Sequence, residues 1–106
     1  MSDEAKTEAM IQAKGLNAPR LTPADIDAQI VDDAYHVFPG TTLTVCALTL
    51  RNGFIVTGMS AAASPENFDE AIGRSIAYRN AREQIWGHEG YLLRSKLSGH
   101  IQEVAS

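Results

Sequence analysis

The sequence has little of what disulfide-bonded, zinc-binding or membrane-spanning proteins require. It contains one cysteine, Cys46, which excludes an intramolecular disulfide and a zinc site built from several cysteines. No apolar run approaches the ~20 residues of a membrane-spanning helix. Residues 1–15 lack the basic and apolar regions of a secretory signal peptide. We therefore expect a soluble protein that lies in a reducing cytoplasm and has no membrane partner.

Sequence motifs of catalysis are also missing. The chain contains no P-loop, GxGxxG, GxSxG, HExxH or CxxC pattern. Its histidines, His36, His88 and His100, are scattered, and His88-Glu89 lacks the Pro-Cys-x-x-Cys segment of a zinc deaminase. The sequence therefore predicts no enzyme activity, no cofactor and no metal site.

The charge balance disfavours a general nucleic-acid-binding protein. The net charge is −4 and the pI is near 5.2, whereas such proteins usually carry a basic balance. A chain of 106 residues with 44% hydrophobic residues is typical of one globular domain. We expect a flexible, polar arm over residues 1–20 and a single domain over residues 21–106. Oligomerisation would add apolar burial to so small a domain.

The segment "LTPAD" predicts the first helix of this domain. Thr22 is a good N-cap, Pro23 suits the first helical position, and Asp25 favours the positive end of the helix dipole. The apolar stripe that follows predicts a helix that ends near Ala34.

Two strands follow this helix. Residues 41–50 alternate between apolar and polar side chains, and residues 54–60 form the return strand. Between them, Asn52-Gly53 is a strong signal for a two-residue hairpin turn. The sequence thus predicts an antiparallel hairpin, alone or within a small sheet.

A two-residue turn fixes which side chains share a face of the hairpin. It pairs Leu50 with Ile55 and Cys46 with Met59. The expected core face then holds Cys46, Leu48, Leu50, Ile55 and Met59. The second face, with Arg51, Phe54, Val56 and Gly58 among its residues, is too apolar to remain in water. Either the chain's own helices cover this second face or a second subunit does, and we expect it to be the subunit seam.

The C-terminal half predicts two helices. The first begins either at Ser64-Pro65 or at Asn67, which forms a capping box with Glu70, and it ends near Trp86. The segment "GHEG" then interrupts the pattern, and a last helix extends as far as Ile101. The predicted fold class is α+β, with an N-terminal helix, an antiparallel hairpin and two C-terminal helices in a homo-oligomer.

A mixed apolar and cationic stripe follows the longer of these helices. At 100° per residue, one side carries Phe68, Ile72, Ser75, Arg79, Arg82 and Trp86. A guanidinium at a dry surface needs an acceptor. In one interpretation, Arg79 and Arg82 pair with surface carboxylates of Glu83, Asp69 or Glu70. In the other, the stripe is a ligand site, where Ser75, Arg79, Asn80 and Arg82 meet a phosphate while Trp86, Tyr91 or Phe54 stacks on a base. Arg51, at the edge of the expected subunit seam, is able to join this site.

Several longer segments resemble a known family. The runs "YHVFPGTTLTVC", "NGFIVTG", "SPENFD" and "AREQIWGHEGYLL" are similar to those of short tailed-phage proteins of the gene 49/gene 66 product family. The resemblance covers Thr22 to Leu97. This sequence has "VCA" where many members have "VCC", and "GHEG" where "PLEG" is expected.

The order of elements and the pattern of the long helix also resemble phage sponge proteins that defeat Thoeris and CBASS immunity. That resemblance implies a small antiparallel sheet with C-terminal helices and a cyclic nucleotide held between subunits. It also implies that the ligand, glycocyclic ADP-ribose or a cyclic oligonucleotide, is sequestered without cleavage. The alternative is a phage protein-interaction module that inhibits a host factor.

Overall fold

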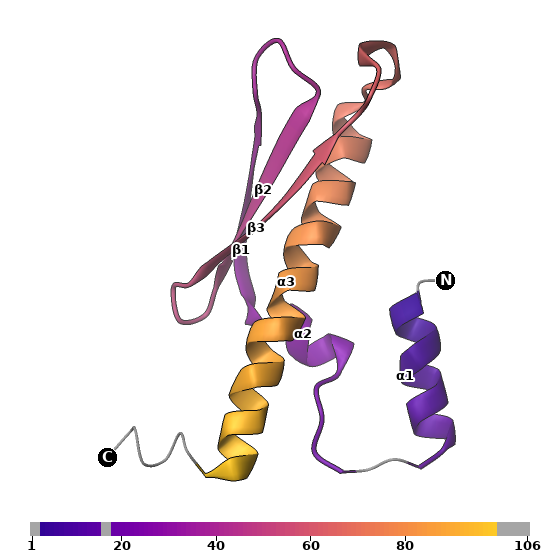
Figure 1. Ribbon diagram of the computed structural model, residues 1–106, viewed down its shortest axis with the longest axis vertical. Helices are drawn as coiled ribbons and strands as arrows, with labels where there is room; N and C mark the ends of the chain where they lie inside the picture. The colour runs from indigo at the N-terminus through magenta and orange to yellow at the C-terminus, as the bar shows by residue number, and fades with distance from the viewer. Residues whose placement is uncertain (1–2, 16–17, 100–106) are drawn as a thin grey trace.

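The computed structural model describes residues 3–15 and 18–99. Its elements are, in order, α1 (Asp3–Ala13), α2 (Pro23–Gln29), β1 (Ile30–Val37), β2 (Leu43–Leu50), β3 (Ile55–Ala61), a 3-10 turn (Pro65–Asn67) and α3 (Glu70–Ser98). The three strands form one antiparallel sheet in the order β1-β2-β3, and α3 runs along one face of it (Figure 1). The α+β class is confirmed. The end of the predicted domain, with His100 and Ile101, lies outside the described residues.

Helix α2 begins as predicted but ends earlier. The Thr22 hydroxyl accepts a hydrogen bond from the Asp25 backbone N–H at 3.2 Å, and the Asp25 carboxylate accepts one from the Thr22 N–H at 2.9 Å. The predicted end near Ala34 is wrong, because Ile30 adopts an extended conformation and opens β1. Pairing of β1 with β2 overrides the short helical pattern, so the hairpin is part of a three-stranded sheet.

The hairpin turn is one residue longer than predicted. The Leu50 carbonyl accepts from the Gly53 N–H at 2.9 Å, and the Leu50 N–H donates to the Phe54 carbonyl at 2.8 Å. Gly53 has a positive φ of 90°, as expected for a three-residue hairpin loop with a bulge. The predicted register is therefore wrong: Thr49 pairs with Ile55, rather than Leu50 with Ile55. This shift of one residue turns every side chain of β3 to the other face.

The two faces of β3 are consequently exchanged relative to the prediction. Val56 and Gly58 are buried beneath α3, so they cannot form the predicted subunit seam. Ile55 and Met59 are 55% and 59% exposed, so they do not belong to the core. The prediction for β2 is correct, since its core residues Cys46, Leu48 and Leu50 are buried.

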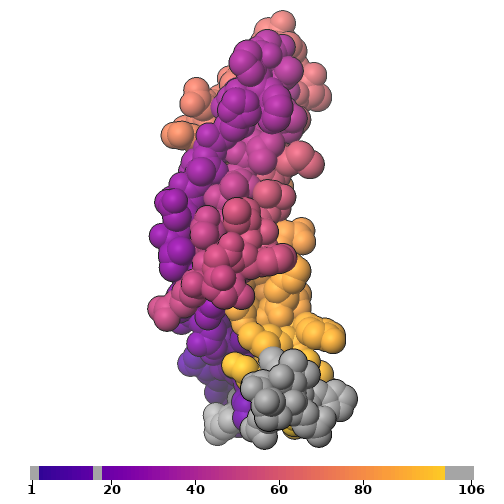
Figure 2. Space-filling view, turned by 90° about the vertical axis from the view of Figure 1, so that its left-hand side faces the viewer, coloured from indigo at the N-terminus to yellow at the C-terminus, as the bar shows by residue number. Residues whose placement is uncertain are grey.

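No described element covers the sheet face that points away from α3. Figure 2 views the molecule from the sheet side and shows the strands at the surface over most of their length. We call this surface the open sheet face. Its residues include the half-buried Val45 and Ala47 and the exposed Ile55, Thr57 and Met59.

Helix α3 is one continuous helix, so the prediction of two C-terminal helices is wrong. Its N-cap is Asp69, whose carboxylate accepts from the Ile72 N–H at 3.0 Å, rather than Ser64 or Asn67. The helix continues through Gly87 and Gly90 because each interior glycine costs only about 1 kcal/mol relative to alanine.

Small residues let α3 lie close to the sheet. Gly73, Ala77, Ala81 and Ile85, spaced four residues apart, form its buried side. A methyl group on Gly58 would lie only 2.1 Å from the backbone nitrogen of Ala81. The core between sheet and helix consists of Ile26, Cys46, Leu48, Leu50, Val56, Ala77, Ala81 and Ile85.

Candidate functional site

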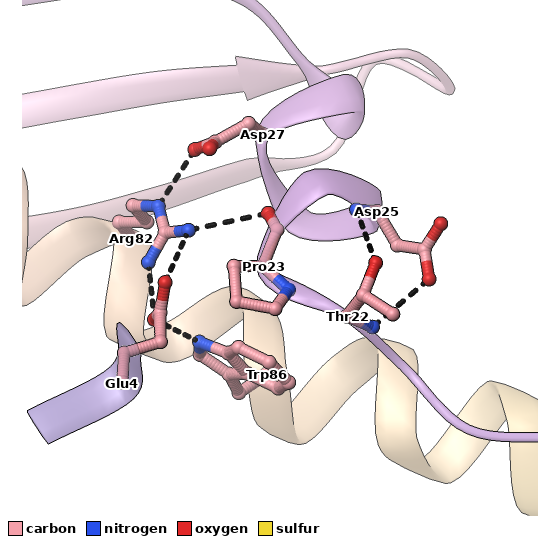
Figure 3. Close-up of polar contacts among 7 residues, drawn as sticks. All are labelled: Glu4, Thr22, Pro23, Asp25, Asp27, Arg82 and Trp86. Atoms are coloured by element: carbon pink, nitrogen blue, oxygen red, sulfur yellow. Dashed lines mark hydrogen bonds and ion pairs between the residues drawn. The ribbon is translucent and has the colours of Figure 1, made fainter. Parts of the chain in front are cut away.

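Arg82, on α3, lies where α1 and α2 meet this helix (Figure 3). Its Nη1 and Nη2 donate to the two carboxylate oxygens of Glu4 at 2.6 and 2.9 Å. Its Nε donates to Asp27 Oδ1 at 2.8 Å, and Nη2 also donates to the Pro23 carbonyl at 3.3 Å. We call Glu4, Pro23, Asp27, Arg82 and Trp86 the Arg82 site.

The Glu4 carboxylate is held on two sides. Trp86, one helical turn after Arg82, donates its indole N–H to a Glu4 oxygen at 3.1 Å. The Arg82 side chain is only 15% exposed, so its paired, charge-assisted hydrogen bonds are partly shielded from water. These hydrogen bonds lower the pKa of Glu4 and raise the pKa of Arg82. The site therefore favours an ionised oxyanion in this position.

Arg82 pairs with carboxylates, as in the first of the two sequence-based interpretations, but not with the carboxylates named there. Its partners are carboxylates, yet they are Glu4 and Asp27 rather than Glu83, Asp69 or Glu70. Glu4 lies 78 residues away in the sequence. The acidic start of α1 is visible in the sequence, but no local pattern connects it with Arg82. The structure gives residues 3–13 of the predicted arm a helical conformation, and the flexibility of residues 1–20 stays a prediction.

Two predicted ligand residues share a side of α3 with Arg82. Ser75 and Arg79 are exposed, and Arg79 has no ion-pair partner among residues 3–15 and 18–99. In an α-helix, residues three apart differ by about 60° around the axis. Arg79 and Arg82 can therefore approach one ligand from the same side.

Asn80 and Arg51 lie elsewhere, and each joins two elements of the fold by a hydrogen bond. The Asn80 side-chain amide donates to the Met59 carbonyl at 2.8 Å, which joins α3 to β3. The Arg51 Nε donates to the Ala28 carbonyl at 2.6 Å, which joins the hairpin tip to α2.

The remaining aromatic residues lie apart from the Arg82 site. Phe54 contacts the His88 ring edge to face, with ring centroids 5.1 Å apart, and Tyr91 is 77% exposed. A shallow groove between β3 and α3 is lined by Phe54, Ile55, Val56, Thr57, Gln84 and His88. Sequence reasoning missed His88 in this groove. Of the eight predicted ligand residues, Arg82 and Trp86 are the two whose side chains donate to one common group, the Glu4 carboxylate of the same subunit.

Metal-holding clusters, a reactive thiol and membrane-spanning helices are the other features to consider in the described part of the chain. Residues 3–15 and 18–99 contain no cluster of three histidine, cysteine or acidic side chains that could hold a metal ion. Burial raises the pKa of the Cys46 thiol. No helix within these ranges is both long and apolar enough to span a bilayer.

The sequence was compared with known proteins. Residues 21–97 match the family described as "Phage protein (N4 Gp49/phage Sf6 gene 66) family". Helix α1 lies before the matched range. No curated protein matches the chain. No solved structure matches it either.

Proposed function

The chain belongs to the N4 Gp49/phage Sf6 gene 66 family of phage proteins, and from this premise we propose that it sequesters a cyclic nucleotide immune messenger. In this proposal it is a non-enzymatic counter-defence protein that acts in the host cytoplasm. Its ligand is glycocyclic ADP-ribose or a cyclic oligonucleotide, which it holds at a subunit interface and does not cleave.

The observation that carries the proposal is the oxyanion geometry of the Arg82 site. A guanidinium and an indole N–H converge there on one carboxylate. A phosphate presents similarly spaced oxygens, which an arginine binds with the same pair of parallel hydrogen bonds. Arg79 adds a second guanidinium on the same side of α3, so the surface suits a ligand with more than one phosphate.

The placement of the aromatic residues supports a site shared between subunits. Phe54 and Tyr91 are 51% and 77% exposed, and neither belongs to the Arg82 site of its own chain. A base that stacks on one of these rings could therefore join one subunit's ring to its neighbour's arginines. The open sheet face supplies apolar surface for such an assembly.

A thermal-shift screen with glycocyclic ADP-ribose and cyclic oligoadenylates tests the proposal. A ligand at 100 to 1,000 times its Kd should stabilise the protein by about 2.7 to 4.1 kcal/mol. The variants Arg82→Ala and Arg79→Ala should lose most of this shift, and Arg94→Ala, an exposed arginine later on α3, is the matched control. Intact ligand should be recovered after the complex is heated. Absence of any shift with every messenger would refute the proposal, and recovery of cleaved ligand would refute sequestration.

The open sheet face favours a second candidate, a protein-interaction module that inhibits a host factor. Ile55 and Met59 present apolar side chains there, more than half exposed. In that case Met59→Lys should abolish counter-defence activity in infected cells, and Arg82→Ala should leave it intact. Loss of activity in Arg82→Ala would instead favour ligand sequestration, whatever the effect of Met59→Lys on the subunit contact.

A further inference from the structure

Helix α1 contributes the anion that the Arg82 site holds. We propose that α1 is a displaceable strap: its Glu4 occupies the Arg82 site in the free protein, and an anionic ligand binds there only when Glu4 withdraws. The inference deepens the proposed function and rests on it only for the identity of the natural ligand.

Arg82 has no pair of N–H groups left for a second anion. A guanidinium has five N–H donors. In this structure Nε donates to Asp27, Nη1 and Nη2 donate to Glu4, and Nη2 also donates to the Pro23 carbonyl. Those contacts use four donors, so an incoming phosphate finds no free pair of parallel N–H groups. It must replace Glu4 to make a paired contact.

The adjoining groove between α1 and α3 is acidic while α1 is in place. Its lining includes Trp86 and four carboxylates, those of Asp3, Glu4, Glu8 and Glu83. Three of the four belong to α1. With α1 in place, the groove repels an anion. When α1 leaves, most of that negative charge leaves with it, and Arg82 then dominates the local field.

Helix α1 is attached at the surface of the domain and adds nothing to the core. None of its residues is buried. Glu8 forms a paired contact with Arg20, with both hydrogen bonds at 2.7 Å, but Arg20 precedes α2 and does not belong to the core. This pair therefore ties α1 to the segment that leads to α2 rather than to the core. The residues that match the phage family begin at 21, beyond α1. The helix can thus move away while the core between the sheet and α3 stays intact.

The chain carries its own reporter of this movement. Trp86 is the only tryptophan, and its indole N–H donates to Glu4. Displacement of Glu4 should therefore change the intrinsic fluorescence. Inorganic pyrophosphate is a suitable probe, because it offers phosphate oxygens without a base.

The test compares pyrophosphate affinity, read from Trp86 fluorescence, in the wild-type full-length chain and in Glu4→Gln. The substitution removes the competing charge, so we expect about tenfold tighter binding, because a hydrogen bond to a charged group typically accounts for at least that factor. Asp3→Asn, which removes one charge from the same helical turn, is the control and should bind like wild type. Arg82→Lys in the Glu4→Gln background should lose the gain, because lysine cannot form the paired contact.

Equal pyrophosphate affinity of wild type and Glu4→Gln overturns the strap. A gain in affinity in Asp3→Asn as large as that in Glu4→Gln also overturns it, because that result would show a general effect of charge. Failure of pyrophosphate to bind either protein also overturns it. The proposed function fails separately. If Glu4→Gln binds pyrophosphate more tightly but no variant binds a cyclic nucleotide, the strap stands and sequestration falls. If cyclic nucleotides bind wild type and Glu4→Gln equally, the strap falls and sequestration stands.

Discussion

At the scale of single residues, Gly58 lets β3 lie directly against the backbone of α3. A methyl group there would lie 2.1 Å from the Ala81 nitrogen and 2.4 Å from the Ala77 carbonyl oxygen. Because both neighbours are backbone atoms, neither can rotate away, so the strand and helix must separate. We expect Gly58→Ala to destabilise the fold by at least about 1–3 kcal/mol, the typical cost of overpacking.

Urea denaturation followed by far-UV circular dichroism measures this loss. Thr57→Ala is the control, because Thr57 is exposed on the open sheet face of the same strand. It should change the free energy of unfolding by no more than about 0.5–1 kcal/mol. A Gly58→Ala variant as stable as wild type would show that β3 and α3 are not packed this closely.

The Glu4 carboxylate makes the docking of α1 dependent on pH. Hydrogen bonds from Arg82 hold the pKa of Glu4 below its ordinary value of 4.5. A lowered pKa in the folded state means that the contact is fully formed above pH 4.5 and is lost as the pH falls through the lowered value. Asp27, which also pairs with Arg82, remains as the second carboxylate nearby.

Trp86 fluorescence should therefore change in acid, below pH 4.5. The Glu4→Gln variant should lack this transition, while circular dichroism of both proteins reports whether the fold survives at the same pH. An identical fluorescence titration in both proteins would assign the change to another group.

At the scale of elements, the continuity of α3 through Gly87 and Gly90 is open to a direct test. A Cβ on either glycine would meet no atom within 4 Å, and neither has a positive φ. Alanine is about 0.8–1.0 kcal/mol better than glycine inside a helix. Gly87→Ala and Gly90→Ala should each raise the free energy of unfolding by roughly that amount in thermal or urea denaturation.

Gly99 provides the matched comparison, because it ends the same helix with a φ of 84°. Gly99→Ala should destabilise the protein, since alanine rarely adopts a left-handed conformation. If Gly87→Ala behaved like Gly99→Ala, the helix would end at "GHEG".

The errors of sequence-based prediction for these elements share one physical origin. The cap at Thr22 and the buried side chains of β2 were predicted correctly because they depend on neighbours within a few residues. The loop predicted at Asn52-Gly53 is one residue shorter than the observed loop. Loops of two and of three residues both suit this pair, and the choice depends on how β3 packs beneath α3. The break predicted at "GHEG" was wrong for a similar reason, because propensity is weak beside the continuity of a packed helix.

The candidate site shows the same limit over a longer range. A cationic stripe on α3 could be predicted from helical periodicity, and so could the need of Arg82 for an acceptor. The acceptor itself could not, because Glu4 belongs to a separate helix 78 residues earlier in the chain. Only the folded chain brings α1, α2 and α3 together.

At the scale of the whole molecule, the layer arrangement leaves one face of the sheet uncovered by the described elements. A two-layer domain with a helix on one face exposes the other face of its sheet. On that face Ile55 and Met59 are 55% and 59% exposed, which is unusual for apolar side chains on a sheet face. We propose that a second copy of this chain covers the open sheet face.

Light scattering coupled to size-exclusion chromatography tests this assembly. The wild-type chain should elute as a dimer or larger oligomer, and the double variant Ile55→Lys/Met59→Lys should dissociate, because two buried ammonium groups at the interface would be strongly unfavourable. Leu97→Lys is the control, since Leu97 is 55% exposed, as Ile55 is, but lies near the end of α3. Circular dichroism should show that the double variant keeps its fold, because neither residue belongs to the core. A wild-type monomer at micromolar concentration, or a double variant that stays assembled, would place the subunit contact elsewhere and remove the open sheet face from it.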